Sequence, residues 1–279
     1  MNLGDLDLFK EVLTGGVYDE SAWSLIEEER VSRARRWLPQ WRQAVLHSEM
    51  LRKWLEGRGI ALVRTRPFDR AKRDAGRDWP LCGYTMIGRK RLDHLQHCIE
   101  TVIAENLPGD VVETGVWRGG ACMLAKAVLD ARGAHERCVW LADSFRGLPS
   151  PKNATDGQDL SGMPYLAVTA EQVRHNFARF GLLDERVRLI EGWFGETLPT
   201  APIRRIAVLR LDGDLYHSTA DALNALYDRV TPGGFVVADD FLTWPGCRRA
   251  VVDFLRDRGE EPRIETIDHT AVFWRKGFR

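Results

Sequence analysis

From residue 91 onward, short apolar runs alternate with segments that carry apolar residues at helical spacing. The apolar runs occupy residues 110–114, 138–142, 187–190, 206–211 and 235–238. The segments with helical spacing cover residues 92–105, 120–129, 169–180, 218–227 and 248–258. In the third of these, Thr169 and Gln172 form the capping-box pattern that starts a helix. This alternation predicts a parallel, doubly wound α/β sheet with buried strands.

Two short predicted strands lie near the end of the chain, at residues 263–266 and 271–274. Four residues separate them, 267–270, which is too few for a helical crossover. The spacing therefore predicts an antiparallel hairpin added to the parallel sheet. Such a hairpin departs from a plain dinucleotide-binding fold.

The first 85 residues show helical patterns and few strand signals. Residues 21–38 have an amphipathic spacing that Pro39 ends, and residues 41–55 repeat it. Residues 64–80 are highly charged without sustained periodicity, which favours a solvated loop and leaves open a mobile lid or subunit contact. We expect a helical N-terminal region, 1–85, that acts as lid or oligomer contact, followed by the sheet domain, 86–279.

Two acidic clusters follow two of the predicted strands. Asp212 and Asp214 come directly after the run 206–211, and Asp239 and Asp240 come directly after the run 235–238. The carboxyl ends of parallel strands meet at one edge of a sheet, where ligands bind. Because so many partly buried carboxylates are costly without a cation, the pattern predicts a divalent-metal site. Oxygen ligands suit Mg²⁺ or Ca²⁺ better than Zn²⁺.

A glycine-rich turn follows the first predicted strand. Glu113, Gly115 and Gly119 give the spacing E-x-G-x-x-x-G, which differs from the G-x-G-x-x-G of nicotinamide sites. Small residues let the backbone approach a ligand closely. The acid would repel a pyrophosphate and suits a ligand with an amino group, such as S-adenosylmethionine.

Acidic residues also end the next two predicted strands. Asp143 could accept the hydroxyls of a ribose or cap a turn. Glu191, with Trp193 after it, could border an adenine or belong to a core aromatic pair. With Glu113 and Asp212 they place an acid at four successive strand ends, which indicates an adenosine-containing ligand in a methyltransferase-like site.

Composition narrows the functional classes. The 40 basic and 40 acidic residues cancel, so the overall charge gives no argument for nucleic-acid or membrane binding. No apolar stretch approaches the roughly 20 residues of a membrane span, and the start of the chain lacks a secretory signal pattern. The five cysteines are scattered without a C-x-x-C pair, so we expect reduced thiols and a cytoplasmic protein.

Several segments, in this order, resemble the macrocin/mycinamicin O-methyltransferase family of natural-product sugar methyltransferases. The matching segments are 76–80 (GRDWP), 85–88 (TMIG), 91–97 (RLDHLQH), 112–122 (VETGVWRGGAC), 142–145 (ADSF), 210–216 (RLDGDLY) and 232–235 (PGGF) with Asp239-Asp240. The resemblance implies a Rossmann-like class I methyltransferase sheet. It also implies S-adenosylmethionine- and Mg²⁺-dependent methylation of a sugar hydroxyl on a glycosylated secondary metabolite, in antibiotic biosynthesis. A dimer-based homo-oligomer is expected on the same ground.

The resemblance also assigns roles to residues. Mg²⁺ would bind Asp212, Asp239 and Asp240, with Asp214 in a supporting or structural role. Asp212 would be the general base, and His217, which lies just past the acidic cluster, is the alternative. The expected cofactor contacts are Met86, Glu113, Gly115, Gly119, Asp143, Ser144, Glu191, Trp193 and Asp212.

Other interpretations stay open at this point. A catechol-type methyltransferase would share metal and cofactor, a nicotinamide-dependent oxidoreductase would share the sheet, and a non-catalytic adenosine-binding scaffold would need no acidic triad. His94 and His97 could bind a metal at i, i+3, although an ordinary helix face is favoured. The turn-rich segment 150–167, with Tyr165, is expected to be flexible and to contact a hydrophobic aglycone.

Overall fold

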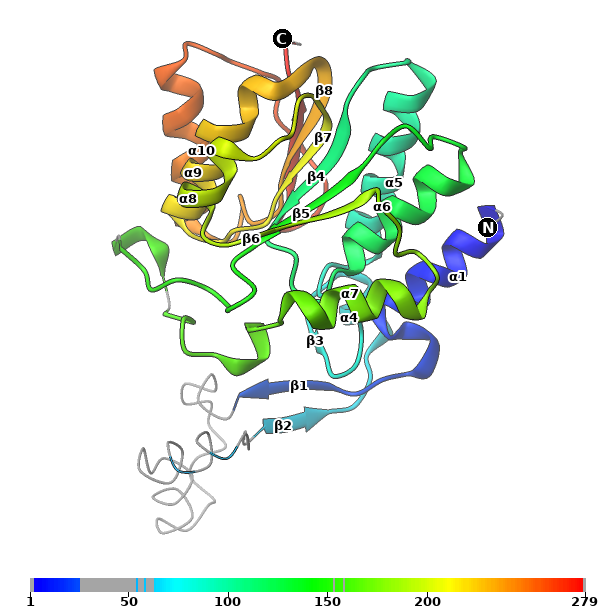
Figure 1. Ribbon diagram of the computed structural model, residues 1–279. Helices are drawn as coiled ribbons and strands as arrows, with labels where there is room; N and C mark the ends of the chain where they lie inside the picture. The colour runs from blue at the N-terminus through cyan, green and yellow to red at the C-terminus, as the bar shows by residue number, and fades with distance from the viewer. Residues whose placement is uncertain are drawn as a thin grey trace.

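A computed structural model describes residues 3–25, 54, 58, 63–152, 154–157 and 159–277. Its main body is a seven-stranded sheet in the order β6-β5-β4-β7-β8-β10-β9 (Figure 1). The parallel strands are β4 (Asp110–Thr114), β5 (Val139–Asp143), β6 (Val187–Glu191), β7 (Ile206–Leu211) and β8 (Val230–Ala238). The hairpin strands β9 (Glu265–Thr266) and β10 (Val272–Arg275) pair antiparallel with each other, and β10 pairs antiparallel with β8. The predicted parallel sheet and C-terminal hairpin are both confirmed.

Helices cover both faces of the sheet (Figure 1). One face packs against α1 (Leu3–Thr14), α5 (Arg89–Ala104), α6 (Gly120–Ala131) and α7 (Ala170–Arg179). The other face carries α8 (Phe194–Thr197), α9 (Tyr216–Leu226) and α10 (Pro245–Asp257). Short 3-10 turns are η1 (Gly16–Tyr18), η3 (Ala154–Asp156), η4 (Pro164–Leu166), η5 (Leu198–Thr200) and η6 (Tyr227–Arg229). Because helices cover both faces, every residue of β7 is buried, including Arg210, the one charged residue in its apolar run.

The predicted capping box starts α7. The Thr169 hydroxyl accepts a hydrogen bond from the backbone N–H of Gln172 at 3.2 Å. The bond satisfies one of the four N–H groups that the first turn of a helix leaves without a partner. The helix therefore begins where the sequence places it.

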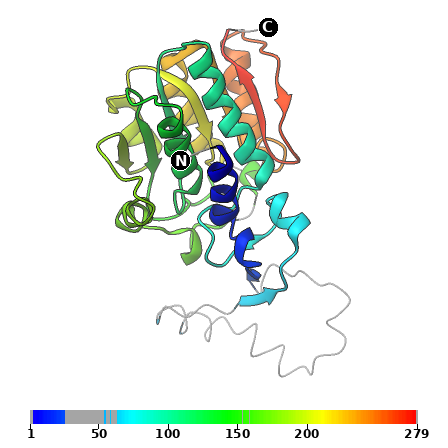
Figure 2. The same cartoon turned by 90° about the vertical axis from the view of Figure 1, so that its right-hand side faces the viewer.

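The N-terminal region holds a second, small sheet in the order β2-β1-β3, at the lower end of the molecule in Figure 2. Its strands are β1 (Ala22–Leu25), β2 (Val63–Arg66) and β3 (Trp79–Pro80), and both β2 and β3 pair antiparallel with β1. The helix predicted over 21–38 is therefore wrong at 22–25, because this segment pairs with strands 38 or more residues away, which local periodicity does not reveal. Residues 26–38 and most of 41–55 lie outside the described residues.

The charged segment 64–80 forms regular secondary structure where its composition favours a loop, although residues 65–67, 70–72 and 77 are exposed. It contains β2, the short helix α4 (Arg70–Asp74) and β3. Arg73 is buried, binds Asp78 at 2.8 Å and donates to the carbonyl of Thr14 at 2.7 Å. The charge of Arg73 therefore helps to hold the N-terminal region together. The role of segment 64–80 as a lid stays a prediction.

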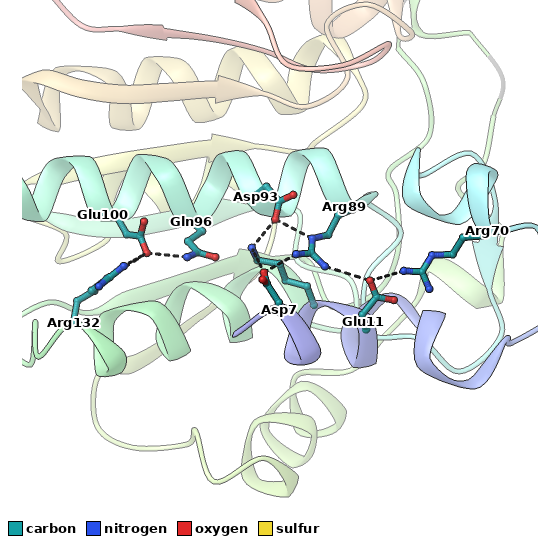
Figure 3. Close-up of polar contacts among 9 residues, drawn as sticks. Asp7, Glu11, Arg70, Arg89, Asp93, Gln96, Glu100 and Arg132 are labelled. Carbon is teal, nitrogen blue, oxygen red and sulfur yellow. Dashed lines mark hydrogen bonds and ion pairs between the residues drawn. The ribbon is translucent and has the colours of Figure 1, made fainter. Parts of the chain in front are cut away.

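Helix α1 joins the core of the sheet domain. Leu6, Phe9 and Leu13 are buried in the same apolar cluster as α5 and α6. Beside them a chain of ion pairs runs from α4 through α1 to α5 (Figure 3), in which Arg89 pairs with Asp7 at 2.5 Å and with Glu11 at 3.2 Å. The domain boundary at residue 86 stays a prediction. Within the described part of the chain, no helix is long and apolar enough to span a membrane.

Candidate active site

The ends of β7 and β8 bring the three predicted metal ligands together. Leu211 lies opposite Ala238 in the parallel register, so the residues that follow each strand are neighbours. Asp212, Asp239 and Asp240 each offer a carboxylate oxygen, and these oxygens lie within 4.8 Å of one another. Asp239 and Asp240 are buried, with exposed fractions of 2% and 8%. The predicted convergence of acids at one edge of the sheet is confirmed.

Two buried arginines lie among these acids. Arg210, on β7, places Nη1 2.8 Å from Asp212 Oδ2 and Nη2 2.5 Å from Asp239 Oδ1, the latter an ion pair without aligned hydrogen-bond geometry. It also contacts the Glu113 carboxylate. Arg91, on α5, pairs with the other oxygen of Asp239 and, through Nε, with Asp268 Oδ2 at 3.1 Å. Asp239 is thus held from two sides.

Negative charge exceeds positive charge in this cluster. Burial, Asp212 and Asp239 raise the pKa of Asp214 to about 8. Burial and the neighbouring aspartates raise the pKa of Asp240 well above its usual value. Burial also raises the pKa of Glu113 to about 7, against the opposing effect of Arg210. The two arginines therefore do not neutralise the cluster, which favours the binding of a further cation.

The glycine turn lies against the end of β7. Gly115 has φ +88°, and a Cβ atom there would meet the carbonyl oxygen of Asp212 at 1.7 Å, so only glycine fits. The turn is fixed by Asp143, whose Oδ2 accepts from the N–H of Val116 at 2.7 Å and whose Oδ1 accepts from the N–H of Phe145 at 2.8 Å. Asp143 thus shapes the turn as a cap and also lines the cavity beside it.

A cavity of about 570 Å³ opens at this edge, a volume within the range of about 300–1,000 Å³ typical of small-molecule sites. Seven of the predicted site residues line it: Met86, Gly115, Asp143, Ser144, Trp193, Asp212 and His217. The lining also includes Asp214, Leu166 and Trp117. The cavity therefore extends from the glycine turn to Asp212 and Asp214, whereas Asp239 and Asp240 do not line it.

Three predicted cofactor contacts lie elsewhere. Glu113 points into the core, where it accepts from the Cys122 thiol at 2.6 Å and contacts Arg210. Gly119 starts α6 and faces Phe177. Glu191 is exposed at the end of β6. None of the three lines the cavity, and their roles toward a cofactor stay predictions.

Sequence reasoning missed the two arginines. A signal for Arg210 was present, because a charged residue inside the buried run 206–211 requires a buried counter-charge. Arg91 gave no such signal, since its segment reads as the first turn of an amphipathic helix. His94 packs against Phe273 with ring centroids 4.3 Å apart, on the helix face that covers the sheet. That position fits the favoured structural role.

The strand order, the antiparallel hairpin, the glycine turn and the acidic cavity define an α/β methyltransferase of class I. Comparison with known families specifies the class further: the family model described as macrocin O-methyltransferase (TylF) matches residues 4–276. The chain belongs to this family and is an O-methyltransferase. That membership favours methyl transfer over the nicotinamide-dependent and non-catalytic alternatives.

Similar proteins agree with the family. The chain is 53% identical over 207 residues to the 8-demethyl-8-(2,3-dimethoxy-α-L-rhamnosyl)-tetracenomycin-C 4'-O-methyltransferase of Streptomyces olivaceus, covering 72% of this chain and 78% of the relative. It is 43% identical over 222 residues to the mycinamicin III 3''-O-methyltransferase of Micromonospora griseorubida, covering 77% and 87%. Among solved structures, the O-methyltransferase NovP matches with TM-score 0.81 and 40% identity over 99% of this chain and 98% of that one.

Proposed function

We propose that this protein transfers the methyl group of S-adenosylmethionine to a sugar hydroxyl of a glycosylated secondary metabolite, with Mg²⁺ at the aspartate triad. The observation that carries the proposal is the single cavity that joins the glycine turn to Asp212. Support for a sugar acceptor comes from the relatives, one of which is named for a rhamnosyl tetracenomycin. The acceptor is thus a carbohydrate hydroxyl and not an acidic phenol.

The residues present fit a hard divalent cation. Asp212, Asp239 and Asp240 supply only oxygen donors, which Mg²⁺ prefers. Asp240 Oδ2 is buried and has no hydrogen-bond partner among the described residues, as expected of an atom that a cation would satisfy. Mg²⁺ bound there would act as a Lewis acid that makes the acceptor hydroxyl more acidic. Arg91 and Arg210 hold Asp239 in place for this role.

The methyl donor would occupy the part of the cavity that the strand ends and the glycine turn line. Gly115 would allow the backbone to approach the donor, and Asp143 and Ser144, which line the cavity, would bind its ribose. Trp193, two residues after the end of β6, would border the adenine ring. Met86 lines the same cavity. The support for these assignments is that all of these residues line the same cavity.

The transfer breaks the bond from sulfur to the methyl carbon and forms a bond from that carbon to the acceptor oxygen. The hydroxyl proton passes to a base of the protein. Asp212 is our choice, because it is both in the triad and in the cavity wall. His217 and Asp214 line the cavity too, and replacement of each by a neutral residue in turn identifies the base.

The test combines binding and turnover. S-adenosylmethionine, S-adenosylhomocysteine and NAD⁺ are titrated with Mg²⁺ and with EDTA, and methyl transfer to p-nitrophenyl α-L-rhamnoside and to catechol is followed by mass spectrometry. We expect both adenosyl ligands to bind, and the rhamnoside to be methylated only with Mg²⁺. If only catechol is methylated, the acceptor is a small diol and not a sugar.

Asp240→Asn tests the metal, since Asp239 and Asp212 form ion pairs with arginines whose loss would confuse the result. Titration of Mg²⁺ should show affinity reduced at least about tenfold, while S-adenosylhomocysteine binds as in the unchanged protein. Full activity of the variant in EDTA would rule out the metal role. The cytoplasmic location and the homo-oligomeric state also stay predictions. Light scattering would measure the oligomeric state.

A further inference from the structure

An aromatic contact links the N-terminal sheet to the cavity. Tyr165, in η4, stacks on Trp79 of β3 with ring centroids 5.6 Å apart and planes at 3°. The same Tyr165 ring lies 5.1 Å from that of Trp117, in the glycine turn. We call these three side chains the aromatic column. It joins three segments that are far apart in the sequence.

Hydrogen bonds and a cation fix the column. The Tyr165 hydroxyl donates to the carbonyl of Pro80, and the Trp117 indole donates to the carbonyl of Tyr165 at 2.9 Å. The Arg118 guanidinium lies 4.3 Å from the Trp117 ring and donates to the carbonyl of Gly83 at 2.8 Å. The column is therefore held at its ring faces and at its polar edges.

The column holds the cavity wall from outside the sheet. Leu166 follows Tyr165 and lines the cavity, while Trp79 does not line it. The glycine turn has an anchor of its own, because Asp143 binds the N–H of Val116. Loss of Trp79 should therefore loosen η4 more than it loosens the glycine turn.

We propose that Trp79 and Tyr165 are positioning residues for the methyl acceptor, an inference that rests on the proposed function. They fix the stretch of wall that Leu166 contributes, which no strand end supplies and which we assign to the acceptor. The donor side of the cavity also contacts Tyr165 through Trp117, but Asp143 anchors it separately, so we expect it to depend on them less. Trp79 would thereby influence acceptor binding although it does not line the cavity.

The experiment compares Trp79→Leu with Trp79→Phe, which keeps an aromatic ring to stack on Tyr165. In Trp79→Leu the KM for p-nitrophenyl α-L-rhamnoside should rise roughly three- to tenfold, the factor that such an aromatic contact is worth. The KM for S-adenosylmethionine and the affinity for S-adenosylhomocysteine should stay within about twofold. Trp79→Phe should restore most of the acceptor KM.

Trp140→Leu is the matched control, because Trp140 is half-buried on β5, bonds to Asp110 at 2.8 Å and does not line the cavity. It should lower the melting temperature without raising the acceptor KM. An unchanged acceptor KM in Trp79→Leu, or equal losses for acceptor and donor, would overturn the proposal.

Hydrogen exchange separates this proposal from the proposed function, because it requires only bound S-adenosylhomocysteine. In Trp79→Leu the amides of residues 160–167 should exchange at least about tenfold faster, while those of residues 113–118 keep their rates. If the rhamnoside is not methylated by the unchanged protein, the proposed function fails. The exchange result alone then shows whether Trp79 holds residues 160–167 in place. An equal change of exchange rate in both segments would contradict the proposed role of the aromatic column.

Discussion

Arg210 Nη2 lies 2.5 Å from Asp239 Oδ1, which places a buried cation directly behind one of the proposed metal ligands. The same guanidinium reaches Asp212 at 2.8 Å and also contacts Glu113. Replacement by glutamine leaves these buried carboxylates facing one another. We expect Arg210→Gln to lower the free energy of unfolding by about 3–5 kcal/mol, as for a broken buried ion pair. Urea denaturation in EDTA measures it.

Mg²⁺ should recover part of that loss. The variant has one cation fewer in the cluster, so a bound divalent ion should stabilise it more than it stabilises the unchanged protein. Arg210→Lys keeps the charge and loses the fork that reaches several carboxylates, so its loss should be smaller. Equal stabilisation of all three proteins by Mg²⁺ would contradict this coupling between the arginine and the metal.

Gly115 and Gly133 offer a matched pair of substitutions. Both have positive φ, +88° and +68°, but a Cβ at 115 would meet the Asp212 carbonyl at 1.7 Å and one at 133 would meet nothing within 4 Å. Gly133→Ala should cost about 1 kcal/mol from backbone strain alone. Gly115→Ala should also displace the turn from β7 and lower the affinity for S-adenosylhomocysteine at least about tenfold. Calorimetric titration of both variants decides the point.

The sequence predicted the sheet and the convergence of acids because both follow from local order, whereas the family resemblance selected the triad from the four carboxylates. Each buried strand is one apolar run, and the register of parallel strands carries Asp212 and Asp239 to the same edge without further information. The arginines are different. Arg91 approaches Asp239 across 148 residues, and the packing of α5 on the sheet determines that contact. Periodicity alone does not provide it.

The small N-terminal sheet shows the same limit. Residues 22–25 were predicted to be helical, but their strand exists because β2 and β3 pair with it from both sides. The charge of residues 64–80 predicted solvent, yet Arg73 is buried by Asp78 and by the carbonyl of Thr14. In both places the partner is distant, so tertiary pairing overrode the local pattern.

His94 should make the fold sensitive to acid. Burial lowers the pKa of His94 from 6.5 to about 4, so the folded protein holds the ring neutral where the unfolded chain protonates it. Stability from this group is full above pH 6.5 and is lost as the pH falls toward about 4. Between these limits the unchanged protein should lose up to about 3 kcal/mol more than His94→Gln. Denaturation at both pH values measures the difference.

The exposed His175 on α7 provides the control. His175→Gln should reproduce the pH dependence of the unchanged protein, because an exposed ring gains little from being neutral. An identical loss of stability in His94→Gln and in the unchanged protein would show that His94 protonates in the folded state at no extra cost.

The docking of α1 depends on one buried lysine. Lys10 is 3% exposed, and its ammonium lies 2.5 Å from Asp93 on α5 (Figure 3 shows Asp93 beside Arg89). Arg70, by contrast, is 53% exposed although it pairs with Glu11 at 2.7 Å in the same chain of charges.

Lys10→Met keeps the apolar stem and removes the charge, so the free energy of unfolding should fall by about 1–2 kcal/mol. Arg70→Ala should change it by less than about 0.5 kcal/mol, because solvent screens an exposed pair. Urea denaturation measures both, and hydrogen exchange in α1 should rise only in Lys10→Met. Equal losses in the two variants would mean that burial of the ammonium does not decide how α1 is held.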